Sequence, residues 1–405
     1  MHGGLAMSDA DNSGGFTDSF TETTSTGWFS RIGQSIAGVL FGIVLILGSG
    51  VILFWNEGRA VQTARSLTEG QGVVVDADAA RVDPGNDGKL VHVTGDLKTT
   101  APLNDAEFGV STPAARLVRT VEMYQWKEES HTETRKNFGG SEEHVTTYTY
   151  IQTWSDARID SAKFKRPDGH ANPQMRYRRF EVAARDATLG AFRPGEGVLG
   201  HLAAGSEFRL DPRVLDAVRQ RAGASARVAD GRIYLGADPA QPHVGDLRVS
   251  YHVAPAGPVS MIGRQAGTDF AEYQTKAGDR LLMVRAGTLS AGDMFKAAEE
   301  ENRILTWVLR AVGVVAMFIG WMLMMRPLVV LADVIPFLGS VMGAGTGLVA
   351  LLVTAVVAPV IIAIAWLWYR PLVSLGVLVV GGAVAYGIKV LAARRRAARA
   401  APAPA

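Results

Sequence analysis

Cysteine is absent from the 405-residue sequence, and charged residues are scarce at 20% of the chain. Without thiols the protein has no disulfide, thiolate metal site, iron–sulfur cluster or cysteine nucleophile. Neither sign of charge is in excess, because 41 Lys and Arg residues stand against 39 Asp and Glu residues and leave a net charge of +2. Bulk charge therefore gives no reason to expect a nucleic-acid partner, and we expect none.

Common catalytic motifs are missing as well. The eight histidines lack H-E-x-x-H or any other metal-ligand spacing, and no G-x-S-x-G or S-x-x-K motif supports serine catalysis. Gly343, Gly345 and Gly347 form no phosphate loop, because they lie in an apolar run without a preceding strand or a following Lys-Ser/Thr. The sequence therefore predicts no catalytic residue, no cofactor-binding residue and no metal ligand.

What the sequence has is long apolar runs. No charge occurs from 32 to 56, and charge nearly disappears again from 304 to 388. A helix of about 20 apolar residues crosses the roughly 30 Å of bilayer hydrocarbon with every backbone group bonded internally. The first run is too long, and its flank too acidic, for a cleaved signal peptide. The run at 334–369 is too long for one upright crossing and slightly short for two, so we interpret it as one tilted span after a surface or re-entrant piece.

These runs predict an α+β protein with a four-span α-helical membrane region and a large mixed α+β extracytoplasmic domain between spans 1 and 2. The expected organisation is a disordered cytoplasmic N-terminus at 1–31, transmembrane helix 1 at 32–56, the extracytoplasmic domain at 57–303, transmembrane helix 2 at 304–326, an interfacial or re-entrant segment at 327–340, transmembrane helix 3 at 341–369, transmembrane helix 4 at 371–391 and a basic cytoplasmic tail at 392–405.

The orientation follows from the distribution of basic residues. The segment after the last span carries Lys389 and four arginines without an acid, and basic residues near a span end hold it in the cytoplasm. An even number of spans then places both termini in the cytoplasm and the domain on the far side. Arg326 in the second connection agrees with this orientation, whereas Arg370 in the third does not.

The domain shows strand and helix signals. Residues 117–126 and 145–154 are rich in β-branched and aromatic types and predict a long hairpin. Alternation of apolar and polar residues at 247–253 predicts a strand with one buried and one solvent-exposed face. Ser290 followed by Asp293 predicts a helix cap whose helix continues into the second span.

Five short motifs resemble the transmembrane protein 43 family, also called LUMA: NEGRA at 56–60, LTEG at 67–70, VEMYQW at 121–126, VGDLRVS at 244–250 and YRPL at 369–372. The likeness covers about residues 27–388 and is closest to a bacterial-type member with a short Ala/Arg-rich tail. It implies four spans, cytoplasmic termini and a lumenal or periplasmic domain. In animals the family associates with itself and with nuclear-envelope proteins, and membrane-organising and channel-related roles have been proposed for it; the nuclear-envelope partners would not carry over to a bacterium.

Three groups of residues are candidate sites. Asn56, Glu57, Gly58 and Arg59 stand where the first span leaves the membrane, where they would bind a lipid headgroup, pin the domain to the second span, or simply flank a helix end with Arg59 reaching the phosphates. Charges within or beside the apolar runs would face protein or water, and Asp333 would pair with Arg326 or Arg310 in an ion path or serve only as an interface residue. These charges are Arg310, Arg326, Asp333 and Arg370. Small residues one turn apart predict close helix packing: Gly38 with Gly42, and Gly339 with Gly343 and Gly347.

The function expected from these features is that of a non-enzymatic integral membrane protein. It would organise membrane or membrane-protein assemblies through its extracytoplasmic domain and through self-association. Its partners would be the lipid bilayer, further copies of itself and other membrane proteins, and its location a bacterial inner membrane with a periplasmic domain. An ion channel or transport component is the alternative, and a membrane-bound enzyme the third hypothesis.

Overall fold

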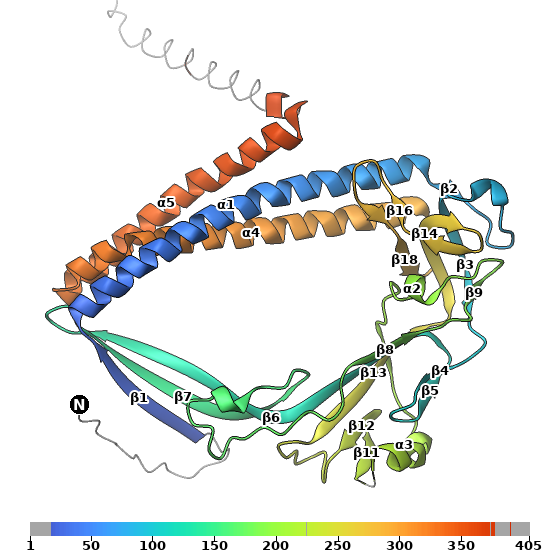
Figure 1. Ribbon diagram of the computed structural model, residues 1–405, viewed down its shortest axis with the longest axis horizontal. Coiled ribbons are helices and arrows are strands. Elements are labelled where there is room, and N and C mark those ends of the chain that lie inside the picture. Colours follow the sequence, from blue (N-terminus) through green and yellow to red (C-terminus); the bar gives the residue numbers. More distant parts are fainter. Residues whose placement is uncertain (1–17, 224, 373, 377–388, 390–405) are drawn as a thin grey trace, which may run out of the picture.

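The computed structural model describes residues 18–223, 225–372, 374–376 and 389. Three long apolar helices lie together on one side, and a β-rich domain is joined to them at both ends (Figure 1). The mixed α+β class is confirmed. Within the described residues three helices are long and apolar enough to cross a membrane, and most of the predicted fourth span at 371–391 lies outside the described residues.

The helices are α1 (Trp28–Val73), α4 (Ala291–Ala332) and α5 (Pro336–Tyr369). The first two lie side by side along much of their length (Figure 1). Each extends well beyond its apolar run: α1 ends at Val73, and α4 begins at Ala291. Ser290 caps α4 as predicted, because its hydroxyl accepts from the Asp293 amide at 3.1 Å.

Two predicted segments differ from the structure. Residues 327–340 are not a separate piece, because α4 continues through Pro327 to Ala332 and α5 begins at Pro336; the two helices form a hairpin with Asp333 at its turn. Disorder was expected throughout residues 1–31, but Asp18–Thr26 is strand β1 and α1 begins at Trp28. The strand is ordered because it pairs with a strand of the domain over nine residues.

The main sheet has the strand order β1–β7–β6–β13–β12–β11, with β10 paired to β13 and β8 paired to β6. The predicted hairpin is confirmed as β6 and β7, and it is longer than expected. The strands of this sheet beyond β1 are β6 (Ala114–Lys136), β7 (Glu142–Ser155), β8 (Phe180–Ala183), β10 (Ser206–Phe208), β11 (Ala226–Ala229), β12 (Arg232–Leu235) and β13 (Leu247–Pro255).

A second sheet has the order β15–β14–β3–β2, with β18 on β14 and β9 on β3. Its strands are β2 (Val75–Asp76), β3 (Leu90–Lys98), β9 (Thr188–Leu189), β14 (Gly257–Ala266), β15 (Asp269–Ala271) and β18 (Met283–Ala286). Two small pairs complete the strands: β4 (Leu103–Asp105) with β5 (Val110–Thr112), and β16 (Tyr273–Gln274) with β17 (Arg280–Leu281). The short helices are α2 (Glu196–Leu199) and α3 (Leu215–Ala222), with 3-10 turns η1 (Pro84–Asn86), η2 (Ser161–Lys163) and η3 (Pro212–Val214).

The domain has its own core, formed between the two sheets by side chains such as Phe108, Leu117, Phe192 and Met261. A smaller cluster joins it to the helices, because Leu67 of α1 and Phe295 of α4 pack with Leu281. The domain is therefore fixed to the far ends of α1 and α4.

Candidate functional site: two ion-pair clusters at the ends of the apolar helices

Glu57 is the centre of the first cluster, which we call the exit cluster (Glu57, Arg310 and Trp366). Its carboxylate accepts two hydrogen bonds from Arg310 of α4, at 2.6 and 2.8 Å, and one from the Trp366 indole of α5, at 2.8 Å. Glu57 is only 1% exposed. A two-pronged guanidinium–carboxylate pair is among the stronger hydrogen-bonded contacts in proteins. Three helices are therefore joined through one carboxylate.

The rest of the NEGRA motif contacts α4 and α5 as well. Asn56 donates to the Thr306 carbonyl at 3.0 Å, and Arg59 donates to the Asn302 side chain and the Thr306 hydroxyl at 3.0 Å each. A Cβ on Gly58 would lie 2.6 Å from the Tyr369 ring, so any larger residue would displace that ring. Asn56 and Arg59 thus bind Thr306 and Asn302 of α4 and attach α1 to that helix.

A cavity of about 540 Å³ opens beside this cluster, between the three helices. Glu57, Arg310, Trp366 and Arg370 line it together with charged residues of α4 such as Lys296 and Glu299. Arg370 follows the last residue of α5, and its amide donates to the Trp366 carbonyl at 2.7 Å. Arg310, for which the sequence predicts protein or water as surroundings, is bound by Glu57, and Arg370 lies at a polar cavity.

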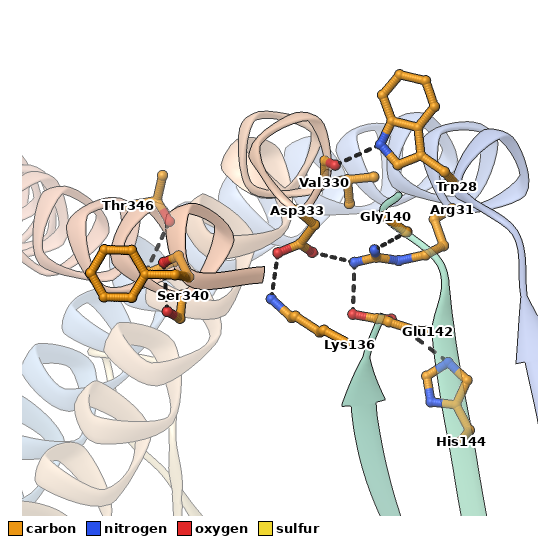
Figure 2. Close-up of polar contacts among 12 residues, drawn as sticks. Trp28, Arg31, Lys136, Gly140, Glu142, His144, Val330, Asp333, Ser340 and Thr346 are labelled. Carbon is orange, nitrogen blue, oxygen red and sulfur yellow. Dashed lines mark hydrogen bonds and ion pairs between the residues drawn. The ribbon is translucent and has the colours of Figure 1, made fainter. Parts of the chain in front are cut away.

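Asp333 is the centre of the second cluster, which we call the turn cluster (Arg31, Lys136, Glu142 and Asp333) (Figure 2). It is fully buried at the turn between α4 and α5. One oxygen accepts from Arg31 of α1, and the other accepts from Lys136 of β6 at 2.6 Å. Arg31 also pairs with Glu142 of β7 at 2.7 Å. The two cations and two carboxylates balance in charge, as buried ions require.

The tip of the β6–β7 hairpin is held against the same helix ends by backbone contacts. The Gly139 amide donates to the Val334 carbonyl at 3.1 Å, and Arg31 donates to the Gly140 carbonyl at 2.6 Å. The Trp28 indole donates to the Val330 carbonyl at 2.9 Å (Figure 2). Gly140 has φ of +80°, and a Cβ there would meet the Trp28 ring at 2.3 Å, so glycine is required at this position for two reasons.

The expected partners of Asp333 were wrong. It pairs with Arg31 and Lys136, whereas Arg310 pairs with Glu57 at the opposite end of the apolar helices. Arg326 is exposed near the turn and makes no ion pair among the described residues. The site residues predicted from the sequence do not include Arg31, Lys136 or Glu142, although Arg31 stands out as the sole charged residue in the described segment 23–56.

The predicted packing glycines differ in how closely neighbouring atoms approach them. Gly42 lies against Gly320 of α4, where an added Cβ would be 2.7 Å from the Gly320 carbonyl oxygen. Gly339 lies against Asp333, while Gly343 and Gly347 have only ordinary contacts, with Val329 and Met322. Gly38 has no heavy atom near its Cβ position. Close approach through Gly42 therefore joins α1 to α4 within one chain, and Gly38 faces outward.

Between the two clusters the described part of the bundle is apolar. Its buried residues include Leu53 of α1, Met317 of α4 and Ala358 of α5. Hydroxyl groups there bond locally or have no partner: Ser49 donates to the Ile46 carbonyl at 2.8 Å, and the Thr354 hydroxyl has none. No group of three or more His, Asp or Glu side chains suited to a metal occurs within the described residues.

Comparison with known proteins identifies the family of this chain. A profile of the family described as Transmembrane protein 43 matches residues 123–371. Transmembrane protein 43 of Homo sapiens is 35% identical over 392 residues, which cover 92% of this chain and 94% of the relative. The chain belongs to the transmembrane protein 43 family. The Mus musculus protein is 35% identical over 368 residues, 87% of this chain and 89% of the relative. The Drosophila melanogaster homolog is 30% identical over 353 residues, 84% and 91% respectively. No solved structure matches the chain.

Four of the motifs that resemble the transmembrane protein 43 family meet in pairs in this structure. NEGRA contacts YRPL, because Gly58 lies against Tyr369. VEMYQW on β6 pairs with VGDLRVS on β13 in antiparallel register, and Glu122 binds Arg248 through two hydrogen bonds at 2.8 and 2.9 Å. LTEG packs against the domain, because Gly70 approaches Leu281 and Phe295. The family motifs thus lie where elements join.

Proposed function

We propose that this protein of the transmembrane protein 43 family organises membrane assemblies, using its extramembrane domain and self-association, and that it has no enzymatic role. The observation that carries the proposal is that the buried carboxylates of the described helices are paired with arginines. Glu57 and Asp333, the buried acids of the helix bundle, are each neutralised by arginine from another helix. Carboxylates paired in this way hold the helices together, and they are not free to exchange a proton or to attack a substrate.

The bilayer placement that we propose follows the apolar runs. Side chains such as Leu40, Leu47, Val312 and Leu352 expose more than half of their surface, as lipid-facing residues do. In the proposed inner membrane the turn cluster lies at the cytoplasmic end of the helices, and the exit cluster at the periplasmic end. The hairpin tip then lies at the cytoplasmic end, because it binds the helix ends there, and the bulk of the domain lies at the end of the exit cluster.

An ion channel or transport component is the competing function. A path within one chain would need charged or hydrated groups along the bundle, whereas the charges of the described helices gather at the two ends and Leu53, Met317 and Ala358 fill the middle. Replacing Asp333 by Asn tests an ion path through this carboxylate: such a path predicts that the ion flux of protein reconstituted in liposomes changes, whereas the organising role predicts the same flux before and after the replacement.

The direct test is affinity purification of the whole chain from native membranes in mild detergent, followed by identification of the co-purifying proteins and lipids. We expect further copies of the chain and a reproducible set of membrane proteins. The Asp333→Asn variant, extracted in parallel, shows whether the turn cluster is needed for that set. Recovery of a monomer alone would contradict both the self-association and the organising role.

A further inference from the structure

The domain touches α1 at both ends of its apolar run. At one end, Arg31 binds Gly140 and Glu142 of the hairpin. At the other, Gln62 donates to Asp279 at 2.6 Å and Gly70 packs against Leu281. Arg31 and Glu57 are separated by about 39 Å of helix at 1.5 Å per residue, which exceeds the roughly 30 Å of bilayer hydrocarbon. If α1 crosses the membrane, the hairpin must pass through the same plane to reach Arg31.

The part of the sheet that makes this passage is the three-stranded ribbon formed by β1, β7 and residues 127–136 of β6 (Figure 1). It is hydrophilic. Residues 127–136 read KEESHTETRK, and all of them from 129 to 135 are exposed. A charged side chain in hydrocarbon costs at least about 2.5 kcal/mol, and an open sheet edge leaves backbone groups unbonded. Acyl chains therefore cannot surround the ribbon.

Both edges of the ribbon are open in the described chain. β1 pairs only with β7, and β6 has its other partners, β8 and β13, at residues 114–123. The two open edges have the same length and the same register along the ribbon. Asp18–Thr26 of β1 and residues 128–136 of β6 pair with the same residues of β7, from opposite sides. Because β1 and β6 are both antiparallel to β7, the two edges also run in the same direction. A rotated second copy can present its β6 edge to the β1 edge of the first, and the pairing repeats around a ring.

We propose that copies of this chain join edge to edge, β1 of one copy beside residues 127–136 of β6 in the next, and that the joined ribbons enclose an aqueous interior with the apolar helices outside. The proposal rests on the self-association proposed above and assigns it a surface. It supplies the missing hydrogen bonds of both edges and places protein instead of lipid around the hydrophilic strands.

The two faces of the ribbon agree with this arrangement. The face that includes Lys136 and Glu142 points to the helix ends at the turn cluster (Figure 2). The opposite face of β1 carries only hydroxyl side chains, and the same face of β6 carries charged and polar ones. These exposed residues are Ser19, Thr21, Thr23, Ser25, Glu129, His131, Glu133 and Arg135. Side chains of this kind suit contact with water.

The absence of cysteine makes the joint directly testable, since any disulfide must come from introduced thiols. His131→Cys on β6 is combined in turn with S19C, T21C, T23C and S25C on β1, a scan that covers stagger between copies. Within one chain, Thr21 and His131 lie on either side of Thr147. Two strand spacings separate them by about 9.5 Å, beyond the roughly 7 Å limit for a disulfide. A disulfide between them must therefore join two copies.

In native membranes under mild oxidation we expect at least one β1 partner of His131→Cys to give dimers and a ladder of higher species on a non-reducing gel. The matched control pairs the same β1 cysteines with a cysteine at the exposed Arg227 (Arg227→Cys) on β11, the outer strand at the other end of the same sheet, and should give monomer only. Amine-reactive crosslinking of the same membranes reports self-association independently. Oligomers by that route with no disulfide at any β1 position overturn the edge joint alone, whereas monomers by both routes overturn the self-association as well.

Discussion

Glu57 joins α1 to Arg310 of α4 and to Trp366 of α5 through one carboxylate. Replacing it by Gln keeps its size and removes the charge that holds Arg310. Breaking a buried ion pair by removing one partner costs about 3 kcal/mol, because the other charge stays buried. We expect a loss of that order in the free energy of unfolding, measured by denaturant titration of the whole chain in detergent micelles and followed by tryptophan fluorescence.

Glu301→Gln is the matched control. Glu301 also pairs with an arginine, Arg285, at 2.5 Å, but its side chain is 61% exposed. An exposed pair contributes less than about 1 kcal/mol. Equal losses for the Glu57 and Glu301 variants would show that the exit cluster is only a solvated helix flank.

Tyr251 gives the domain a dependence on alkaline pH. Burial and the neighbouring Asp105 carboxylate, which accepts from the hydroxyl at 2.7 Å, raise the pKa of Tyr251 above its usual range. The unfolded chain loses this proton near pH 10, so the stability contributed by Tyr251 is complete below about pH 10 and falls as the pH rises further. Unfolding titrations between pH 8 and 11.5 should show a steeper alkaline loss for the natural chain than for Tyr251→Phe. Identical slopes would contradict this assignment.

Individual charges could be predicted to avoid lipid, but their partners could not. The cost of a charge in hydrocarbon indicated protein or water around Arg310 and Asp333, and both are held by protein. Pairing depends on which helix ends meet, and the bond between Arg310 and Glu57 joins residues 253 positions apart. Asp333 follows the last residue of α4, 23 residues after Arg310, so about 35 Å of helix keeps the two side chains from meeting.

At the scale of elements, Gly42 sets the approach of α1 to α4. Leucine at this position would clash with the Gly320 backbone and force the helices apart, at a cost of about 1–3 kcal/mol. Gly38→Leu, one turn earlier on the same helix, should leave stability within about 0.5 kcal/mol because nothing contacts its Cβ position. Thermal unfolding of both variants in the same detergent measures the difference. A larger loss at Gly38 would show that the outward face of α1 is packed after all.

Elements governed by local signals were predictable. The Ser290 cap and the β6–β7 hairpin depend on neighbouring residues or on strand-forming composition, and both are present. Elements decided by distant partners were not. Asp18–Thr26 is short of apolar side chains and forms a strand only because β7 supplies its hydrogen bonds, and the α4–α5 turn is fixed by Arg31 and Lys136 from elsewhere in the chain.

At the scale of the whole molecule, the hairpin tip and the bulk of the domain lie at opposite ends of the apolar helices. Phe138 at the tip is 86% exposed, and the Arg213 side chain at η3 is 92% exposed. A membrane-impermeant maleimide applied to sealed vesicles of known orientation should label Phe138→Cys and Arg213→Cys from opposite sides. The cysteine-free natural chain is the background. Labelling of both from one side would show that the helices do not separate them.

The family and the coarse α+β plan with apolar helices could be read from composition and motifs, since both depend on the sequence itself. The return of the ribbon to Arg31 could not. The pairing of Asp18 with Tyr150 bridges a long apolar helix, and the separation of hydrophobic and polar stretches in the sequence suggests instead that the membrane divides them.

The two clusters also decide how the helices can move. Two ion pairs, Arg31–Asp333 and Glu57–Arg310, connect α1 to α4 near the two ends of the apolar run. Sliding one helix along the other by a single turn of about 5.4 Å would break both ion pairs at once. The two ion pairs therefore oppose sliding of α1 along α4 but leave the pair free to tilt as a rigid body. A change in bilayer thickness would then change the tilt of both helices together, and the domain attached to their ends would move with them.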